Sequence, residues 1–370
     1  MTDSAKKMIY LIAGARPNFM KIAPIVRALT AHSGQFDYRI IHTGQHYDRD
    51  MSDVFFEELG IPKPDYHLEC GGGSHAEQTA KIMVAFEHIC QKNRPDCVLV
   101  VGDVNSTLAC SIVAKKLHIS VAHVEAGLRS GDRSMPEEIN RLVTDSISDW
   151  FFCTEPAGVD NLLQEGKPSQ AIFDVGHVMV DNLLYQADRL AQADCSGFKS
   201  PQLKDQHADY GVITLHRPSN VDDQDVLAAI LGSLNTLSER LPLIFPAHPR
   251  TKANLQRFGL KPAPGITLTG PLSYMDFLNL WKDARLMLTD SGGLQEETTA
   301  LGIPCLTLRH NTERPITVDE GTNVLVGTEA SSVLREAYNI LDGGGKTGKR
   351  PALWDGHAAE RIVRQLHGLL

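Results

Sequence analysis

The chain has 370 residues, which at about 150 residues per domain favours two domains over one. Apolar residues make up 42% and charged residues 22%, a composition typical of soluble globular proteins and not of disordered, collagen-like or coiled-coil chains. Lys and Arg number 36 against 45 Asp and Glu, and the net charge of −9 argues against nucleic acid or an anionic membrane as partner.

The cysteines and the first residues indicate the compartment. The seven cysteines are odd in number and irregularly spaced, with no C-x-x-C pair, so neither a zinc site nor a disulfide framework is predicted. The opening residues MTDSAKKMIYLIAG lack a signal-peptide cleavage site, and no apolar run approaches the about 20 residues of a membrane span. We therefore expect a cytoplasmic protein without membrane contact.

Short runs rich in Val and Ile recur in the first half, each followed by an amphipathic, helix-like stretch. Strands that alternate with helices predict right-handed βαβ units on a mostly parallel sheet. Near-continuous apolar runs such as CVLVVG fit a sheet that is covered on both faces. The predicted strands are Met8–Ala13, Tyr38–His42, Cys97–Val101, Ser120–Val124, Trp150–Cys153 and Ala171–Val175.

A polar stretch between about Tyr185 and Asp209 is the predicted domain boundary. The sequence predicts an α/β protein of two Rossmann-like, doubly wound domains, residues 1–185 and 186–370, that face a central cleft where the ligand binds. Residues 356–370 have helical periodicity, and this last helix is expected to pack back on the first domain. The second series of strands is Tyr210–Thr214, Leu243–Pro246, Ile266–Thr269, Leu286–Thr289, Cys305–Leu308 and Val324–Val326.

Two motifs are set aside as false leads. GGGKTGK at Gly343–Lys349 has the spacing of a Walker phosphate loop, but Arg350 follows in place of Ser or Thr, and a helix-like segment precedes it. His42 and His46 are four residues apart, but TGQHYD is predicted to be a loop and not a helix, and no third ligand is found, so no metal is predicted. Since no G-x-G-x-x-G follows a strand and no G-x-S-x-G occurs, neither a nicotinamide or flavin cofactor nor a serine nucleophile is predicted.

Polar residues follow the predicted strands of the first domain. Arg16 and Lys21 lie near the start of a helix that follows the first strand, where backbone N–H groups and cations together favour an anion. Asp103 comes directly after the strand that contains CVLVVG, and Asn105 or Ser106 is expected to cap the next helix. Capping alone does not require an aspartate at that point, so we assign Asp103 a chemical role.

The following strand also ends in a carboxylate. Glu125 follows a buried apolar run, where its charge needs a partner, and Arg129 and Arg133 are the candidates. Glu137 and Glu138 occupy the first turn of the next predicted helix, where negative charge suits the helix dipole. Clustered carboxylates push their pKa values apart, so this rim can supply both a general acid and a general base.

The second domain supplies a phosphate-binding pattern. Asp290 and the small residues Ser291, Gly292 and Gly293 lead from a strand into a helix, which bares N–H groups at the positive end of the helix dipole. Glu297 follows one turn later, within reach of sugar hydroxyls. With these cations and carboxylates the expected ligand is a nucleotide-diphosphate sugar. Other polar residues at this edge are His216, Arg217, His248, Arg250, Arg309 and Arg314.

Motifs covering about residues 10–330 resemble, in order, the non-hydrolysing UDP-N-acetylglucosamine 2-epimerase family. The resemblance implies a GT-B-like fold, a UDP-N-acetylhexosamine substrate, a homodimer and no redox cofactor; no cofactor or metal is expected. The motifs are GARPNFMKIAPI, TGQHYD, GDVNSTLA, HVEAGLRS, PEEINR, TLHRPSNVD, TDSGGLQEE and GIPCLTLRHNTERPITVDEGTNVLVG.

The resemblance also implies the chemistry and the residues. A base removes the C2 proton while UDP leaves from C1, and UDP adds back to the glycal after reprotonation on the other face. The implied catalytic residues are Asp103, Glu125, Glu137 and His216. The implied substrate-binding residues, with Glu297 on the ribose and Pro271 and Phe277 near uracil, are Arg16, Lys21, His248, Pro271, Phe277, Ser291, Gly292, Gly293, Glu297 and Arg314.

Two stretches depart from the family pattern. Cys70–Thr79 replaces a segment that contributes to a regulatory UDP-sugar site in many bacterial members, and the loop SGDRSM between Arg129 and Pro136 is shorter. The substrate is therefore either UDP-N-acetylglucosamine or a modified relative such as a diacetamido uronate. A hydrolysing 2-epimerase, a GT-B glycosyltransferase and a non-catalytic UDP-sugar sensor stay open as alternatives.

Overall fold

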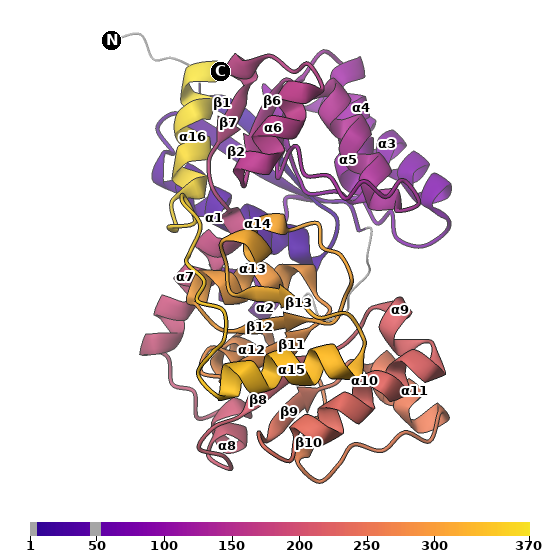
Figure 1. The fold of residues 1–370 in the computed structure, drawn as a ribbon. Coiled ribbons are helices and arrows are strands. Elements are labelled where there is room, and N and C mark those ends of the chain that lie inside the picture. The colour runs from indigo at the N-terminus through magenta and orange to yellow at the C-terminus, as the bar shows by residue number, and fades with distance from the viewer. Residues whose placement is uncertain (1–5, 45–52) are drawn as a thin grey trace. The chain divides into compact units, whose positions relative to one another are not determined.

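The computed structural model describes residues 6–44 and 53–370. The chain forms two α/β units, each built around a parallel sheet (Figure 1). Unit 1 comprises residues 1–184 and 352–370, and unit 2 comprises residues 185–351. The expected second domain, residues 186–370, therefore differs from unit 2 in residues 352–370, which belong to unit 1.

Unit 1 contains a seven-stranded parallel sheet in the order β3-β2-β1-β4-β5-β6-β7. Its strands are β1 (Lys7–Ala13), β2 (Phe36–His42), β3 (Tyr66–His67), β4 (Cys97–Val101), β5 (Ser120–Val124), β6 (Trp150–Cys153) and β7 (Ile172–Asp174). Its helices are α1 (Arg16–Ala31), α2 (Asp53–Leu59), α3 (His75–Lys92), α4 (Asn105–Lys116), α5 (Pro136–Ile147), α6 (Pro156–Gln164), the 3₁₀ turn Ser169–Ala171 and α16 (Ala358–Leu369).

Unit 2 contains a six-stranded parallel sheet in the order β10-β9-β8-β11-β12-β13. Helix α7 (Val178–Gln192) leads into it from unit 1. The strands are β8 (Gly211–Thr214), β9 (Leu243–Pro246), β10 (Ile266–Thr269), β11 (Leu286–Thr289), β12 (Cys305–Thr307) and β13 (Asn323–Leu325). The helices are α8 (Ser200–Lys204), α9 (Pro218–Val221), α10 (Gln224–Leu237), α11 (Pro249–Arg257), α12 (Tyr274–Trp281), α13 (Gly292–Leu301), α14 (Pro315–Asp319) and α15 (Ala330–Leu341).

Both sheets are stabilised by burial on two faces. All five residues of β4 are buried, and each unit has a core of aliphatic side chains from strands and covering helices. Fully burying one such side chain contributes about 1.5–3 kcal/mol, so these strands fold as the centre of a covered parallel sheet. The expected α/β fold of two Rossmann-like sheets is confirmed.

Strand order reverses once in each sheet, between β1 and β4 in unit 1 and between β8 and β11 in unit 2. At such a point the helices that follow the two strands lie on opposite faces of the sheet, and a crevice opens at the carboxyl ends. The residues directly after β1, β4, β8 and β11 therefore decide what each unit can bind.

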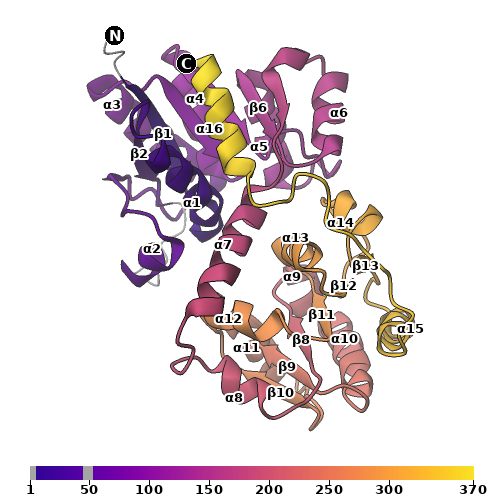
Figure 2. The same cartoon turned by 90° about the vertical axis from the view of Figure 1, so that its left-hand side faces the viewer.

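The predicted strands are confirmed, and each boundary lies within two residues of the predicted one. The two-residue strand β3 was missed because it is too short for a periodic pattern. Helix α16 lies in the stretch with predicted helical periodicity, and it packs on α1 within unit 1 (Figure 2).

The Walker-like stretch 343–349 follows helix α15 and leads into no helix, as expected of a false match. This stretch packs closely on another backbone segment of unit 2, since a Cβ on Gly348 would lie 2.4 Å from the carbonyl carbon of Gly321. The backbone N–H of Lys349 donates to the carbonyl of Glu320 at 2.9 Å. Gly348 thus serves close packing between two backbone segments.

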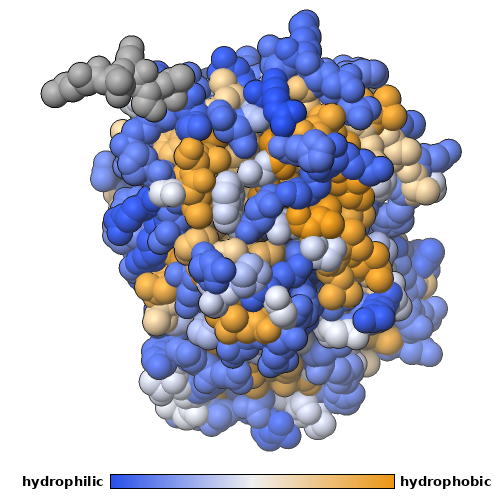
Figure 3. Space-filling model, turned by 90° about the horizontal axis from the view of Figure 1, so that it is seen from above, coloured by the Kyte–Doolittle hydropathy of each residue, from blue (hydrophilic) through white to orange (hydrophobic). Residues whose placement is uncertain are grey.

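No helix among the residues that the structure describes is both long and apolar enough to cross a membrane. The face shown in Figure 3 is largely hydrophilic, with hydrophobic patches between the polar side chains.

Two glycines allow the cost of backbone strain to be distinguished from the cost of a steric clash. Gly127 and Gly166 both have a φ of +79°, but a Cβ on Gly127 would lie 2.1 Å from the carbonyl oxygen of Gly158, whereas nothing lies within 4 Å of one on Gly166. We expect Gly166→Ala to cost about 1–2 kcal/mol through the left-handed backbone alone. Gly127→Ala should cost about 1–3 kcal/mol more, through the clash. Urea unfolding of both variants checks this, and equal destabilisation would contradict it.

Candidate active site

The crevice of unit 1 begins where β1 leads into α1. Asn18 ties this turn together, because its Oδ1 accepts from the backbone N–H groups of Gly14 at 3.2 Å and Ala15 at 3.0 Å. Its Nδ2 donates to the carbonyl of Val101 at 3.3 Å, which joins the ends of β1 and β4. Arg16, half-buried in the first turn of α1, has its guanidinium 5.1 Å from the centre of the Phe55 ring.

Asp103 follows β4 and is held by helix α5. Its carboxylate forms an ion pair with Arg141, whose side chain is 4% exposed, and its carbonyl accepts from Nδ2 of Asn140 at 2.8 Å. Arg141 also pairs with Glu138 at 3.0 Å. The buried guanidinium thus fixes the position of the Asp103 carboxylate at the end of β4.

Glu138 is a structural anchor. Burial raises the pKa of this carboxyl, but the backbone N–H groups of Ser130 and Gly131 and the Arg141 guanidinium outweigh burial and lower it. The neighbouring Glu137 is half-buried in the first turn of α5. The first turn of α5, where the helix dipole favours negative charge, therefore holds one glutamate that is fixed by hydrogen bonds and one that lies at the surface.

Glu125 is 2% exposed and stands at the end of β5 with a φ of +73°. Left-handed backbone is strained for a residue with a Cβ, and such strain gathers at functional sites. Its carboxylate pairs with the amine of Lys21, which is 13% exposed. The expected partner Arg129 pairs instead with Asp145 and Glu165, each at 2.8 Å.

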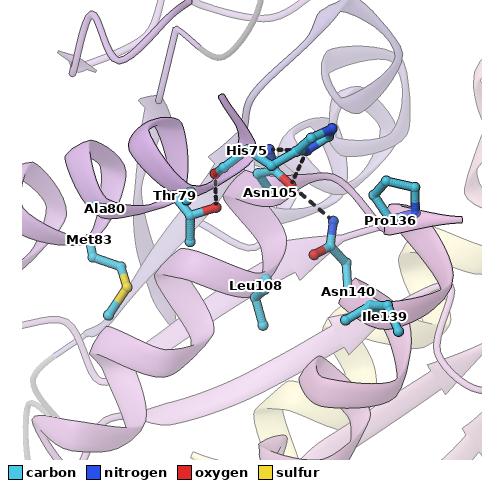
Figure 4. A pocket seen from close by; sticks show the side chains of 10 residues that line it. His75, Thr79, Ala80, Met83, Asn105, Leu108, Pro136, Ile139 and Asn140 are labelled. Carbon is cyan, nitrogen blue, oxygen red and sulfur yellow. Dashed lines mark hydrogen bonds between the residues drawn. The ribbon is translucent and has the colours of Figure 1, made fainter. Parts of the chain in front are cut away.

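A groove of about 530 Å³ lies against this rim, between α3, α4 and α5 (Figure 4). Asn105 was expected to cap α4, but the cap position is Val104 and the Asn105 side chain joins three helices instead. It donates to Gln78 at 2.8 Å, approaches Nδ1 of His75 at 3.1 Å and accepts from Asn140 at 3.2 Å. The loop after β4 is thus supported from both α3 and α5.

The crevice of unit 2 joins β8 and β11 through a histidine–aspartate pair. Nδ1 of His216 lies 2.8 Å from Oδ1 of Asp290, and Asp290 is fully buried while His216 is about half exposed. Burial raises the pKa of Asp290, but hydrogen bonds from His216 and from the Arg217 backbone outweigh it and hold this pKa below its usual range. The ionised Asp290 thus fixes the orientation of the His216 ring.

The turn Ser291–Gly293 begins helix α13, with Ser291 at the cap position. A Cβ on Gly293 would meet nothing within 4 Å, so its backbone is accessible, whereas a Cβ on Gly292 would lie 3.0 Å from Oε1 of Glu313. Glu313 is neutralised by Arg309 at 2.8 Å and Arg217 at 3.3 Å. The turn therefore offers helix N–H groups beside two arginines that already share one carboxylate.

Glu297 lies buried on the second turn of α13. Burial raises its pKa to about 8; the hydroxyl of Tyr274, which donates at 3.3 Å, lowers it in part, and Glu296 raises it. Glu296 itself forms an ion pair with the buried Arg314. Glu296 and Glu297 are consecutive residues of α13, the helix that begins at the turn Ser291–Gly293. Because Arg314 pairs with Glu296, it lies close to Glu297 as well.

Three expected residues lie outside these clusters. His248 caps helix α11 by accepting from the backbone N–H of Arg250 at 3.2 Å, and it is exposed. Pro271 is exposed and Phe277 is half-buried on α12, and their contact with uracil stays a prediction. No group of three or more His, Cys, Asp or Glu that could hold a metal occurs within residues 6–44 and 53–370. His46 lies outside those residues.

Sequence reasoning missed the partners of the site residues. Arg141 was not assigned to Asp103, nor Asp290 to His216, nor Tyr274 to Glu297. A signal existed for Asp290, because it follows β11 as Asp103 follows β4, and the strand order places it beside the end of β8. Arg141 carried the i, i+3 spacing from Glu138 that permits an ion pair on a helix.

The comparisons with known proteins agree with this geometry. The family model described as UDP-N-acetylglucosamine 2-epimerase matches residues 27–367. A Methanocaldococcus jannaschii protein named UDP-N-acetylglucosamine 2-epimerase is 44% identical over 365 residues, covering 96% of this chain and 98% of its own. A Pseudomonas aeruginosa UDP-2,3-diacetamido-2,3-dideoxy-D-glucuronate 2-epimerase is 41% identical over 342 residues, covering 92% and 93%.

A solved structure is similar throughout. The crystal structure of M. jannaschii UDP-GlcNAc 2-epimerase in complex with UDP-GlcNAc and UDP matches with a TM-score of 0.85 and 43% identity, covering 97% of this chain and 99% of that one. The chain belongs to the UDP-N-acetylglucosamine 2-epimerase family, as the motifs indicated.

Two adjacent glutamates should respond oppositely to removal of their charge. A carboxyl with a raised pKa keeps its proton in the folded state, so the stability from Glu297 is present below about pH 4.5 and lost as pH rises through about 8. The free energy of unfolding of Glu297→Gln, relative to that of the unchanged protein, should therefore be higher at pH 8.5 than at pH 5. Glu296→Gln should lose about 3–5 kcal/mol at both, because Arg314 loses its carboxylate.

Urea unfolding at the two pH values measures both effects. The same difference between Glu297→Gln and the unchanged protein at pH 5 and at pH 8.5 would contradict the raised pKa.

Proposed function

We propose that this chain interconverts UDP-N-acetylglucosamine and UDP-N-acetylmannosamine by inverting the configuration at C2. The observation that carries the proposal is Glu125: a buried, strained carboxylate paired with Lys21, one strand away from Asp103, which pairs with Arg141. Two carboxylates on neighbouring parallel strand ends suit proton removal and return on the two faces of one carbon. Membership of the family supports the same reaction.

In the proposed reaction a carboxylate of unit 1 takes the C2 proton while the C1–O bond to UDP breaks, which leaves a glycal and UDP. UDP then adds back at C1 while C2 receives a proton on its opposite face. Asp103, Glu125 and Glu137 are the proposed acid and base groups. The guanidinium of Arg141 holds the Asp103 carboxylate in a fixed position, which supports an acid–base role for this residue.

Departure of UDP develops negative charge on the diphosphate, and preorganised donors stabilise such charge most effectively. We assign this role to His216, to the N–H groups of the turn Ser291–Gly293 and to Arg16. Asp290 holds the His216 ring in a fixed orientation, which supports its role. Lys21 is proposed here too, although its amine pairs with Glu125 in this structure.

The remaining residues of unit 2 are proposed to bind the nucleotide. Glu297 would accept from ribose hydroxyls, Pro271 and Phe277 would contact uracil, and His248 and Arg314 complete the set. Arg314 already pairs with Glu296, so it would act by holding the start of α13 in place. We also propose a cytoplasmic location, which the seven free cysteines, six of them buried, support.

Proton NMR in D₂O with UDP-N-acetylglucosamine tests the function. Deuterium at C2 together with a mixture of two UDP-sugars is the expected result. Release of free N-acetylmannosamine would instead indicate the hydrolysing reaction. If neither C2 exchange nor a product is observed, a glycosyltransferase or a sensor remains as the function.

Asp103→Asn should lower the rate of C2 exchange by about 10²–10⁴-fold, because the amide cannot accept the proton. Affinity for UDP, measured by calorimetry, should stay unchanged, since Asp103 is assigned no contact with the diphosphate. The exposed Asp160→Asn serves as a control and should keep both properties. Loss of UDP affinity with exchange per bound molecule retained would contradict the assigned role.

A modified substrate is the second candidate. The Pseudomonas aeruginosa relative acts, by its name, on a diacetamido glucuronate, and it is about as similar to this chain as several relatives named for the unmodified sugar. The short loop at residues 130–135 is exposed in large part and presents Arg133, a cation suited to a uronate carboxylate. Comparison of kcat/KM for the two UDP-sugars in the same assay separates the candidates.

We further propose a homodimer. The groove between α3 and α5 is lined mainly by apolar side chains, and the apolar residues Ile139 and Val84 stand 42% and 58% exposed on these two helices. Exposed apolar side chains beside an apolar groove are typical of interaction surfaces. A second copy of the chain is the proposed occupant, in keeping with the family resemblance.

Ile139→Asp should convert the dimer to a monomer, because a charge in an apolar interface is left desolvated and unpaired. Leu163 on α6 is similarly exposed, at 45%, but lies outside the groove, so Leu163→Asp is the matched control and should stay dimeric. Light scattering after gel filtration gives the mass of each variant. A monomeric unchanged protein, or an Ile139→Asp dimer, would contradict this surface.

A further inference from the structure

A fully buried histidine stands beside the proposed catalytic carboxylates without a role in the reaction above. His123 lies on β5, two residues before Glu125, and is 0% exposed. Its Nδ1 lies 2.6 Å from Oδ1 of Asp145 on α5, and its Nε2 lies 2.9 Å from the carbonyl oxygen of Gly102. Both ring nitrogens therefore face an oxygen.

Both of these oxygens are acceptors. A backbone carbonyl has no proton to give. Asp145 is ionised: burial raises its pKa, but His123 and Arg129 outweigh burial and lower it. Its second oxygen already accepts from the N–H of Gly127 at 3.0 Å and pairs with Arg129 at 2.8 Å. Both nitrogens of His123 must therefore donate, which makes the ring an imidazolium.

The charges around the ring balance. The imidazolium and Arg129 face Asp145, and Arg129 continues to Glu165 at 2.8 Å, so two cations meet two anions. Burying an isolated charge is costly, whereas a fully hydrogen-bonded, balanced set is tolerated. His123 can thus hold its charge in the interior of unit 1.

The Gly102 carbonyl is one peptide away from the Asp103 side chain. The N–H of Gly102 donates to the carbonyl of Val124 at 3.1 Å, so the end of β4 is tied to β5 on one side. His123 holds the other side of the same residue. Arg141 and Asn140 then fix the Asp103 side chain and carbonyl. The direction of the Asp103 carboxylate depends on all of these contacts.

We propose that His123 is a positioning residue, an imidazolium held by Asp145 whose Nε2–H fixes the Gly102 carbonyl and thereby aims the Asp103 carboxylate. It acts through Gly102 and touches no substrate. The kinetic part of this inference rests on the proposed epimerase function, whereas the protonation of the ring does not.

Two variants separate the two hydrogen bonds of the ring. The amide nitrogen of Asn occupies about the place of Nδ1, and that of Gln about the place of Nε2. His123→Asn should keep the bond to Asp145 and lose the one to Gly102, lowering kcat by about 10²-fold, the cost of a misplacement of about 1 Å. His123→Gln should keep the bond to Gly102 and rescue most of that loss. In both, KM should stay within about threefold.

Glu165→Gln is the matched control, because it alters the far end of the same charged set and leaves both bonds of His123 in place. It should keep kcat. Equal losses in His123→Asn and His123→Gln, or a greater loss in His123→Gln, would overturn the assignment to the Gly102 carbonyl. Lowered kcat in Glu165→Gln would show that the network as a whole matters and overturn it likewise.

Protonation of the ring is measured without substrate. In protein labelled with ¹⁵N-histidine, the His123 signals are those that disappear in His123→Gln. Two ring N–H protons should persist at pH 8.5, where ordinary histidines with a pKa near 6.5 are neutral. A single ring N–H would overturn the imidazolium. This result stands whether or not the protein epimerises UDP-sugars, so failure of the proposed function and failure of this inference are distinguishable.

Discussion

The reversal of strand order in each parallel sheet is the constraint on which the site depends. At β1 and β4, and again at β8 and β11, neighbouring strands send their helices to opposite faces of the sheet. Whatever residues follow these strands are drawn to one crevice. In unit 1 these are Arg16 and Asp103, and in unit 2 they are His216 and Asp290. Residues far apart in the sequence thus become neighbours through topology alone.

Buried charge in these crevices is always matched. Lys21 pairs with Glu125, Arg141 with Asp103, and Asp290 with His216. An unpaired carboxylate at such depth would take up a proton and lose its use as a base, as the raised pKa of Glu297 illustrates. The cations therefore do more than stabilise the fold, because they also fix the positions of the carboxylates beside them.

The sequence predicted the fold well, because apolar runs such as Cys97–Val101 are long enough to mark buried strands. It also predicted which polar residues stand at the strand ends. It could not predict their partners: Lys21 and Glu125 are joined only by the pairing of β1, β4 and β5, and a nearby arginine was the obvious wrong choice. The local rules for helix capping also misassigned Asn105, because its side chain forms hydrogen bonds to α3 and α5 instead of capping its own helix.

The discontinuity of unit 1 has a consequence for how the chain is made. Its last helix, α16, packs on α1, and the carboxylate of Asp181 accepts from the backbone N–H groups of Ala358 and Ala359. A chain leaving the ribosome with its N-terminus first presents every strand of both sheets before it presents α16. Unit 2 can therefore fold before α16 is available to cover the apolar side of α1. The unit that is begun first is thus completed after unit 2, by a helix that follows all of unit 2 in the sequence.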